Sequence, residues 1–427
     1  MTLAPSTLAP ASYRLSKPLE FDIVSARAKQ DPFPIFAAMR QAGPVIPIRL
    51  PFVGRVWVTT THEATEAMVK DNALFVQEGR HAGKSGVAGF SWWMPRPIKL
   101  MTNNMLQKDE PDHRRLRHLV DKAFARRDIL AMRGDVERIA DKLIDGFAGR
   151  AEIDLVDDYA RPLPLAVICD LLGLPEDDRA EFSAMAQQVV SINNVMGLFL
   201  AVPAFNRMLE YARKQVEAAR RTPRAGLIGE LVLAEEAGDK LSEDELIAMI
   251  VVLLFAGFET TRHLIADSVL ILERQPDKKA WLLADPAARM ERAVEELARY
   301  ASPVQSTKPR FVTRDTDFFG VQLARGELVM ALLASANGDP AVFDRPDELQ
   351  LDRFPNPHLV FSSGVHFCLG MQLARLEAQT ALARLYARCS DLSLAAPDRI
   401  DWIERLGIRG PKSLPIRLRR SSERLAA

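Results

Sequence analysis

The sequence predicts a mainly α-helical fold with small β-sheets, and two observations lead to this prediction. Several long segments place apolar residues three and four positions apart, the period of an amphipathic helix; they are 135–147, 203–220 and 292–300. Strand-like segments are short by comparison, and they are 56–60, 318–323, 328–332 and 414–418. Long helices are therefore expected to form most of the molecule.

One predicted helix is much longer than the others. Ser242 and Glu245 have the spacing of a capping box, in which each side chain satisfies a backbone N–H at the start of a helix. Helix-compatible sequence then continues to about Arg274, and its middle is apolar on every side. We expect this helix to be buried through the centre of the molecule, where other elements pack around it.

The chain is expected to form a single domain over residues 21–427, preceded by a flexible tail. Residues 1–20 are rich in Pro, Ala and Ser, and no internal repeat follows them. Residues 338–364 contain four prolines and little periodicity, which predicts a long ordered loop of the kind that usually has a function. A run of helix-forming residues, 371–387, comes soon after this loop.

Composition excludes several classes of protein. Lys plus Arg and Asp plus Glu both number 56, so the net charge gives no reason to expect nucleic acid or an acidic membrane as a partner. The longest apolar run, 246–258, is too short to span a bilayer. Three cysteines cannot form a disulfide framework and favour a reducing compartment. We therefore expect a soluble, cytoplasmic protein.

Cys368 lies in the most informative segment, which reads Phe361-Ser-Ser-Gly364-Val-His366-Phe-Cys368-Leu-Gly370. A cysteine just before a helix meets the positive end of the helix dipole, which favours the thiolate that a soft metal requires. The two glycines allow backbone to approach a bulky planar group. Taken alone, such a cysteine is more commonly a structural residue in the core, as we expect for Cys169 and Cys389.

A second motif lies inside the long predicted helix and reads Ala256-Gly257-Phe258-Glu259-Thr260-Thr261. An acid and a hydroxyl within an apolar helix are costly unless they are paired or used. The small residues leave room beside the helix for a flat ligand. The alternative is a contact between helices in which the threonine bonds its own backbone.

The Cys368 segment resembles the heme-binding loop of bacterial cytochromes P-450, although Ser362 stands where that family often has glycine. The resemblance extends over nearly the whole chain. It implies the cytochrome P-450 fold, with the long central helix over the heme, and heme b as the cofactor. It also implies that Cys368 is the iron ligand and that Phe361, Gly370 and Ala256 contact the heme.

The same resemblance implies roles for further residues. Thr260 and Glu259 would be catalytic, with Thr260 assisting oxygen activation and Glu259 relaying protons from solvent. The heme propionates would be bound by His113, Arg117, Arg310 and His366, which are cations or hydrogen-bond donors. A solvated basic helix is the alternative for the first two. Glu296 and Arg299 would brace the proline-rich loop, whereas most pairs with this spacing are surface salt bridges.

Residues facing the substrate are expected in two places. An aromatic loop contains Phe90, Trp92 and Trp93, and packing of a surface loop explains it equally well. Further residues expected to line the pocket are Val252, Phe255 and Val304.

The resemblance implies a monooxygenase that inserts one oxygen atom of O2 into an apolar organic substrate by hydroxylation or epoxidation. No Gly-x-Gly-x-x-Gly motif occurs, so electrons would come from a separate ferredoxin or flavodoxin with its NAD(P)H reductase. Arg114 and Arg115 would face an acidic electron donor. The alternatives are a peroxygenase, an oxidative-coupling enzyme, a non-catalytic heme sensor and a cysteine hydrolase.

Overall fold

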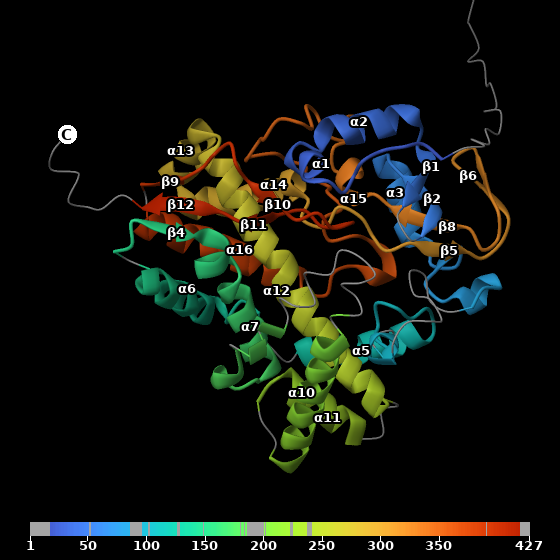
Figure 1. Ribbon diagram of the computed structural model, residues 1–427, viewed down its shortest axis with the longest axis horizontal. Helices are drawn as coiled ribbons and strands as arrows, with labels where there is room; N and C mark the ends of the chain where they lie inside the picture. The colour runs from blue at the N-terminus through green and yellow to red at the C-terminus, as the bar shows by residue number, and fades with distance from the viewer. Residues whose placement is uncertain are drawn as a thin grey trace, which may run out of the picture.

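The structure is a computed structural model that describes residues 18–418 except 51–52, 86–95, 101–102, 126–128, 148, 180, 183, 186–199, 201, 223–224, 237–240 and 390. It is mainly helical with small sheets, as the sequence predicts (Figure 1). Its helices are α1 (Ala26–Gln30), α2 (Phe33–Ala42), α3 (His62–Lys70), α4 (Arg96–Leu100), α5 (Asp112–Ala125), α6 (Arg133–Phe147), α7 (Pro162–Leu172), α10 (Val202–Arg221), α11 (Leu227–Glu236), α12 (Glu243–Glu273), α13 (Pro276–Ala284), α14 (Pro286–Ala301), α15 (Leu333–Ala336) and α16 (Met371–Arg388).

The strands are short and form four sheets among the described residues. The largest sheet has the order β1-β2-β8-β5-β3, in which only β2 and β8 pair in parallel. The strands are β1 (Val45–Leu50), β2 (Gly54–Thr59), β3 (Phe75–Val76), β4 (Glu152–Asp154), β5 (Arg310–Val312), β6 (Thr316–Phe318), β7 (Val321–Leu323), β8 (Leu328–Ala331), β9 (Leu392–Leu394), β10 (Asp401–Trp402), β11 (Pro411–Ser413) and β12 (Pro415–Leu418). The other sheets are β4-β12-β9, β6-β7 and β10-β11.

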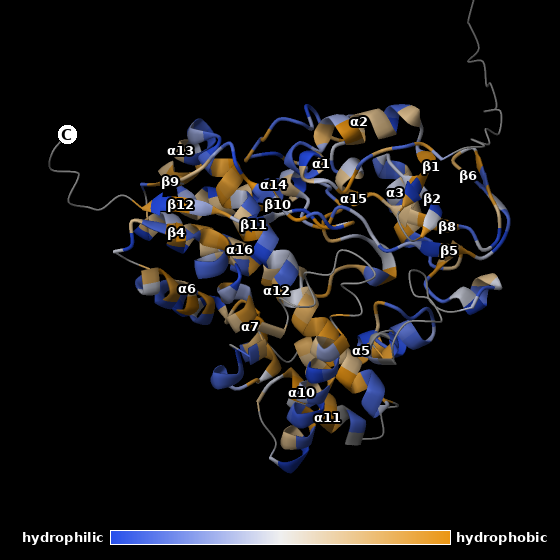
Figure 2. Cartoon of the chain, in the orientation of Figure 1, coloured by the Kyte–Doolittle hydropathy of each residue, from blue (hydrophilic) through white to orange (hydrophobic). Residues whose placement is uncertain are grey.

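Helix α12 crosses the middle of the molecule, as predicted (Figure 1). It has 31 residues, and Ser242 and Glu245 form the expected capping box at its start. Figure 2 shows apolar residues along the part of α12 that passes α7 and α10. The largest hydrophobic core surrounds this helix, while two smaller cores lie on the faces of the five-stranded sheet. Helix α12 therefore connects the helical side of the molecule with the side that carries the large sheet.

The segment 318–323 differs from its prediction, because it is a hairpin of β6 and β7 and not a single strand. Phe319 and Gly320 at its centre have φ angles of 54° and 77°, the left-handed conformation that a tight hairpin turn requires. Helix α14 also begins earlier than expected, at Pro286, where Asp285 caps it by accepting a hydrogen bond from the Ala288 N–H.

The predicted brace of the proline-rich loop is confirmed. Glu296 and Arg299 are fully buried on α14 and form a salt bridge of 2.7 Å. Glu296 also accepts hydrogen bonds from Arg353 at 3.0 Å and from the Gln350 N–H at 3.0 Å. Both of these donors belong to the loop 338–364, so one carboxylate holds the loop in place ahead of Cys368.

The described helices include none that is both long and apolar enough to cross a membrane. The cysteines are free thiols, as predicted. Cys169 is buried in α7, and Cys389 follows the end of α16. Both pack with the large hydrophobic core.

Candidate active site

Cys368 lies in a tight loop between a short 3-10 helix, Gly364–His366, and helix α16. The Cys368 N–H donates to the Phe361 carbonyl at 3.0 Å and closes this loop. Gly364 has a φ of 70°, and a Cβ there would lie 2.7 Å from the Val69 carbonyl oxygen. Glycine is therefore required at 364, both for its conformation and for the close contact with α3.

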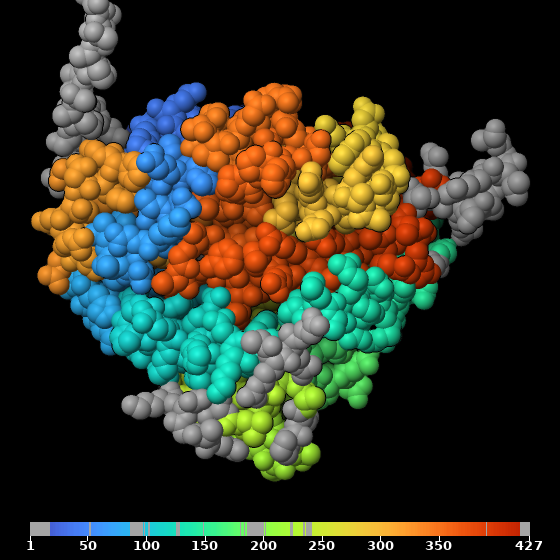
Figure 3. All heavy atoms as spheres, turned by 180° about the vertical axis from the view of Figure 1, so that it is seen from behind, coloured from blue at the N-terminus to red at the C-terminus, as the bar shows by residue number. Residues whose placement is uncertain are grey.

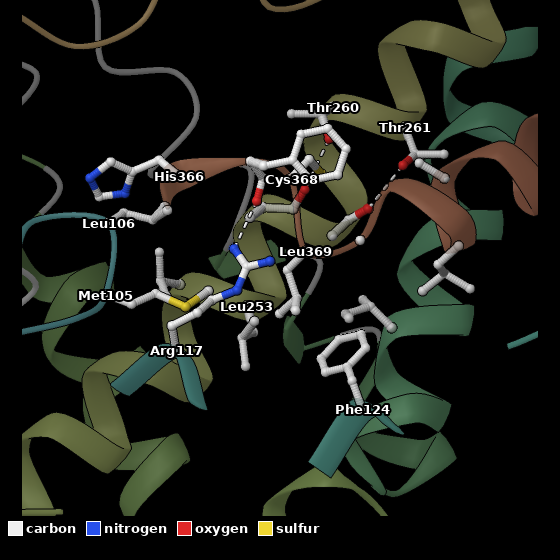
Figure 4. A pocket seen from close by; sticks show the side chains of 18 of the residues that line it. Met105, Leu106, Arg117, Phe124, Leu253, Thr260, Thr261, His366, Cys368 and Leu369 are labelled. Atoms are coloured by element: carbon white, nitrogen blue, oxygen red, sulfur yellow. Dashed lines mark hydrogen bonds between the residues drawn. The ribbon is translucent and has the colours of Figure 1, made fainter. Parts of the chain in front are cut away.

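Two cavities meet at Cys368. The smaller has a volume of about 140 Å³ and the larger about 550 Å³. They share the lining residues Leu106, Ala256, Thr260, Thr261, His366, Cys368 and Ala374. Figure 4 shows the smaller cavity, with Cys368 and His366 on one segment and Thr260 and Arg117 on other elements. The cysteine motif and the motif of α12 therefore form walls of one space, although they are far apart in the sequence.

Helix α12 forms one wall of both cavities. Ala256 is exposed although it lies in the middle of a buried helix, because the cavity runs beside it. A Cβ on Gly257 would lie 2.8 Å from the Ile168 side chain, so this glycine allows α7 to pack closely. The Thr260 hydroxyl donates to the Ala256 carbonyl at 2.9 Å, which leaves its oxygen able to accept a hydrogen bond.

The Cys368 thiol has a raised pKa because it is buried. A hydrogen bond from the Gly370 backbone and the charges of Arg117 and Arg375 act in the opposite direction, but burial has the larger effect. The sequence led us to expect that the start of the helix would favour the thiolate. Burial acts against the thiolate here, and a metal ion bound to this sulfur would favour it.

Four basic side chains gather beside Cys368, as predicted. The His113 and His366 rings are 4.4 Å apart, and Arg117 of α5 donates to the Phe367 carbonyl at 2.7 Å. Arg310 of β5 is buried. Burial, together with the charges of Arg310, His113 and Arg117, lowers the pKa of His366 to about 2. Burial also lowers the pKa of Arg310, to about 10. This cluster would be stabilised by a bound anion.

These residues fit a heme. The buried Arg310 Nε has no hydrogen-bond partner among the described residues, and the His113 Nδ1 lies 3.6 Å from the nearest oxygen of Glu110, beyond hydrogen-bond length. Two propionates would satisfy such donors. A Cβ on Gly370 would meet no atom within 4 Å, so the backbone beside Cys368 borders open space. Phe361 also lines the larger cavity.

The structure differs from the sequence-based expectation at Glu259. This residue is not among the described lining residues, because successive positions on a helix point about 100° apart and Thr260 takes the cavity side. Its carboxylate accepts hydrogen bonds from Arg262 at 3.1 Å and from Arg405 at 3.0 Å, and it lies 3.2 Å from His263. These partners lower the pKa of Glu259 to about 2, although its burial acts in the opposite direction.

The partners of Glu259 were not found from the sequence. Arg262 and His263 follow Glu259 by three and four residues on α12. This spacing predicts contact on one face of a helix. Arg405 comes from a distant segment, and no pattern in the sequence connects it with the helix. We call Glu259, Arg262, His263 and Arg405 the back cluster, since it lies on the side of α12 away from the cavity. Glu259 therefore takes part in a buried ion-pair network and does not contact the cavity.

The residues expected to face a substrate have mixed outcomes. Val252 lines the smaller cavity and Val304 the larger one. Phe255 is not among the described lining residues, because it packs against Phe182 and Phe258 at ring distances of 6.4 and 6.1 Å. Three further residues fall outside the described part of the chain, namely Phe90, Trp92 and Trp93.

Two further side chains near the site are Arg115, which the sequence analysis considered, and Glu377, which it did not. Arg115 is half-buried and pairs with Glu245 at the start of α12 at 2.6 Å, so it is less accessible to an electron donor than the exposed Arg114. Glu377 of α16 lines the smaller cavity, and its full burial raises its pKa well above the ordinary value. Burial therefore favours the protonated form of this carboxyl group, which no motif in the sequence indicates.

Known proteins resemble this chain throughout. The family model for cytochrome P450 matches residues 289–395. The polyketide biosynthesis cytochrome P450 PksS of Bacillus subtilis (strain 168) is 36% identical over 392 residues, which cover 91% of this chain and 96% of that protein. The vitamin D(3) 25-hydroxylase of Pseudonocardia autotrophica is 35% identical over 399 residues, which cover 93% and 96% of the two chains.

A solved structure agrees with these relatives. The myxobacterial cytochrome P450 CYP267B1, in complex with myristic acid, superposes with a TM-score of 0.84 at 34% identity, over 93% of this chain and 99% of that one. The chain belongs to the cytochrome P450 family. It is therefore a heme-binding monooxygenase of the heme-thiolate type.

Proposed function

We propose that this enzyme inserts one oxygen atom of O2 into an apolar organic substrate, by hydroxylation or epoxidation. One observation carries the proposal, namely that Cys368 and Thr260 line the same cavities from different elements. When bound, the heme supplies the redox chemistry that activates dioxygen. The protein supplies the iron ligand, the binding of the cofactor and the substrate, and the handling of protons.

Cys368 would hold the heme iron through its Sγ atom. Arg117 and Arg310 would pair with the two propionates, while His113 and His366 would donate hydrogen bonds to them. Ala256, Phe361 and Gly370 would contact the ring, since they line the cavities with small or flat groups. These eight residues come from α5, α12, β5 and the loop before α16.

Thr260 is the proposed catalytic hydroxyl. Its O–H donates to the Ala256 carbonyl, so its oxygen would accept a hydrogen bond from a proton donor in the cavity and hold that donor in position. Glu259 acts as a positioning residue in this proposal. It fixes the back of α12 through the back cluster and so holds Thr260 at the cavity wall.

The substrate is proposed to be largely apolar. The larger cavity is lined by aliphatic side chains, including Leu264, Val304, Leu333, Leu406 and Ile408. The compounds in the names of the three similar proteins, a polyketide, vitamin D3 and myristic acid, are also large and mostly apolar. Val252 and Val304 are proposed contacts, and Phe90, Trp92 and Trp93 remain proposed contacts from the sequence.

A separate electron donor, a ferredoxin or flavodoxin with its reductase, is proposed to dock near Phe367. This side chain precedes Cys368 and is exposed, and Arg114 on α5 is 81% exposed. Figure 3 shows the face on which the turquoise α5 and α6 region meets the orange-red segment from residue 350 onward. Arg114→Glu should raise the Michaelis constant for an acidic donor several-fold at low salt, with kcat for a peroxide-driven reaction unchanged.

The proposed reaction is tested by carbon monoxide difference spectroscopy followed by turnover under labelled dioxygen. We expect the strongly red-shifted band of a thiolate-ligated heme and one labelled oxygen atom in the product. Product formed only with added peroxide would indicate a peroxygenase, and coupled products without labelled oxygen would indicate an oxidative-coupling enzyme. Ligand binding without turnover would indicate a heme sensor. The three free cysteines support a cytoplasmic location.

A further inference from the structure

The connection from β10 to β11 contains two arginines on either side of a stretch that lines the larger cavity. Leu406, Gly407 and Ile408 line this cavity, and Arg405 and Arg409 come directly before and after them. Figure 1 shows β10 and β11 beside α12, the helix that forms another wall of the same cavity. The contacts of the two arginines therefore determine where this part of the wall lies relative to α12.

Helix α12 pairs with both arginines. The Arg405 guanidinium donates to the Glu259 carboxylate at 3.0 Å. The Arg409 guanidinium lies 3.7 Å from the Asp267 carboxylate, within the range of an ion pair. Since these acids are eight residues apart on α12, the segment 405–409 is attached to the helix at two points about 12 Å apart along its axis.

The backbone that follows this segment packs directly on the same side of α12. A Cβ on Gly410 would overlap the His263 ring, so only glycine allows this approach. His263 follows Glu259 by four residues and therefore lies on the same side of the helix. Within the segment, the Gly407 carbonyl accepts a hydrogen bond of 2.8 Å from the Gln305 N–H. The segment is thus held between α12 and the chain around Gln305.

The two ends of the segment differ in their surroundings. The Arg409 side chain is 9% exposed, donates to the carbonyls of Lys29 at 2.8 Å and Ala301 at 3.3 Å, and lies over the Trp402 ring. The Arg405 side chain is 23% exposed and so lies nearer to solvent. A change at Arg409 would disturb the core, whereas a change at Arg405 can move the adjoining wall while the core stays intact.

We propose that Arg405 is a positioning residue for the substrate, because its ion pair with Glu259 sets the position of Leu406 in the cavity wall. This inference rests on the proposed function, in which the larger cavity holds the substrate. Arg405 is not among the described residues that line that cavity, so it acts through its neighbour Leu406. Glu259 thereby has a second role, since it also fixes the wall that faces large apolar ligands.

The test compares two ligands that bind heme iron through the same kind of nitrogen, imidazole and clotrimazole. Imidazole is small, whereas clotrimazole also needs the apolar wall. Dissociation constants are measured from the absorption shift of the ferric holoenzyme, for wild type, Arg405→Met and Arg405→Lys. Arg405→Met should raise the constant for clotrimazole by about 4-fold, because a displaced wall loses apolar contact worth roughly one CH2 group. Imidazole should bind as in wild type, and Arg405→Lys should restore most of the clotrimazole affinity.

A double-variant comparison tests whether Arg405 acts through Glu259. Glu259→Gln should weaken clotrimazole binding by a similar factor, and adding Arg405→Met should weaken it no further, because both changes remove the same ion pair. Arg138→Met is the matched control. It removes an exposed arginine that pairs with Asp135 on α6, and it should leave both dissociation constants unchanged.

Several outcomes would overturn the inference. Arg405→Met could bind both azoles as wild type does, or weaken both equally, which would indicate damage to the heme site. Arg405→Lys could fail to restore binding, or the effects of Arg405→Met and Glu259→Gln could add. A wild type that binds clotrimazole no more tightly than imidazole would instead refute the large apolar substrate of the proposed function. The carbon monoxide spectrum of the same samples tests the thiolate separately.

Discussion

The two sides of helix α12 differ sharply, although the residues concerned are adjacent in the sequence. Thr260 faces a cavity, and its hydroxyl makes one hydrogen bond to its own helix. Glu259 faces away, is buried, and is bound by Arg262, His263 and Arg405. A buried ion-pair cluster is rigid and costly to disturb, whereas a single hydroxyl beside a cavity can exchange its partners.

This difference teaches that an acid next to a hydroxyl in a sequence does not by itself make a catalytic pair. The helical period places the two side chains about 100° apart, so they serve different surroundings. The cavity side is expected to control chemistry with little effect on stability. The back cluster is expected to control the stability of the fold. It would affect the reaction through the position of α12.

The largest expected effect concerns the residue opposite Thr260. Cys368→Ser should abolish the red-shifted carbon monoxide band and the monooxygenase activity, because a serine hydroxyl does not supply the soft thiolate ligand. Far-ultraviolet circular dichroism should show that the fold persists. Cys169→Ser serves as the control, since that thiol is buried away from the cavities, and its spectrum should match wild type. A normal band in Cys368→Ser would refute the assigned ligand.

The second largest effect is expected from removing the negative charge of Glu259 in the back cluster. Glu259→Gln should lower the free energy of unfolding by about 3–5 kcal/mol, because it leaves the buried cation Arg262 without its carboxylate partner. Chemical denaturation of the holoenzyme measures this loss. If the variant had wild-type stability, slow turnover and a large solvent isotope effect, Glu259 would instead be a direct proton relay. The contrast between the two sides of α12 would then be wrong.

The cavity side is tested by Thr260→Val, which keeps the shape and removes the hydroxyl. Product formation should fall by about 10²-fold while oxygen is still consumed and hydrogen peroxide is released. The free energy of unfolding should change by only about 1 kcal/mol, the value of one hydrogen bond. Thr260→Ser restores the hydroxyl and should restore coupling between oxygen consumption and product.

The last prediction concerns pH. Burial lowers the pKa of His263 from 6.5 to about 4, so the folded state disfavours its protonation. Its contribution to the free energy of unfolding is complete above pH 6.5 and is lost as the pH falls toward 4, about 3 kcal/mol in all. The stability difference between wild type and His263→Gln should therefore narrow over this range. A difference that stays constant would contradict the neutral, buried state of His263.

The measurement compares wild type with His263→Gln because other buried groups change protonation in a neighbouring pH range. Burial raises the pKa of Asp267 to about 7, and this shift acts with the opposite sign. Asp267 is present in both proteins, so its contribution cancels in the comparison. The remaining slope with pH then reports on His263 alone, provided that the two proteins unfold with the same dependence on denaturant.

Local patterns predicted much of this protein. The capping box at Ser242 gave the start of α12, and the loop around Cys368 gave the centre of the site, because both are encoded within a few residues. The back cluster could not be predicted, since Arg405 meets Glu259 only after the chain has folded across 146 positions. The hairpin at Phe319 and the turn of Phe255 toward Phe182 depended on backbone geometry and packing that composition does not specify.

The missing side chain at Gly257 has a consequence for how this enzyme can change. Because Ile168 fills the space beside it, an added methyl group would lie 2.8 Å from the Ile168 side chain, and that side chain of α7 would have to shift. Substitution at this position of the wall is therefore constrained by the packing of α7. On another side of the larger cavity, Val304 and Leu406 belong to short connecting segments, so their side chains can be exchanged without moving a helix. New substrate preferences, whether selected in nature or engineered, are expected to arise from that side.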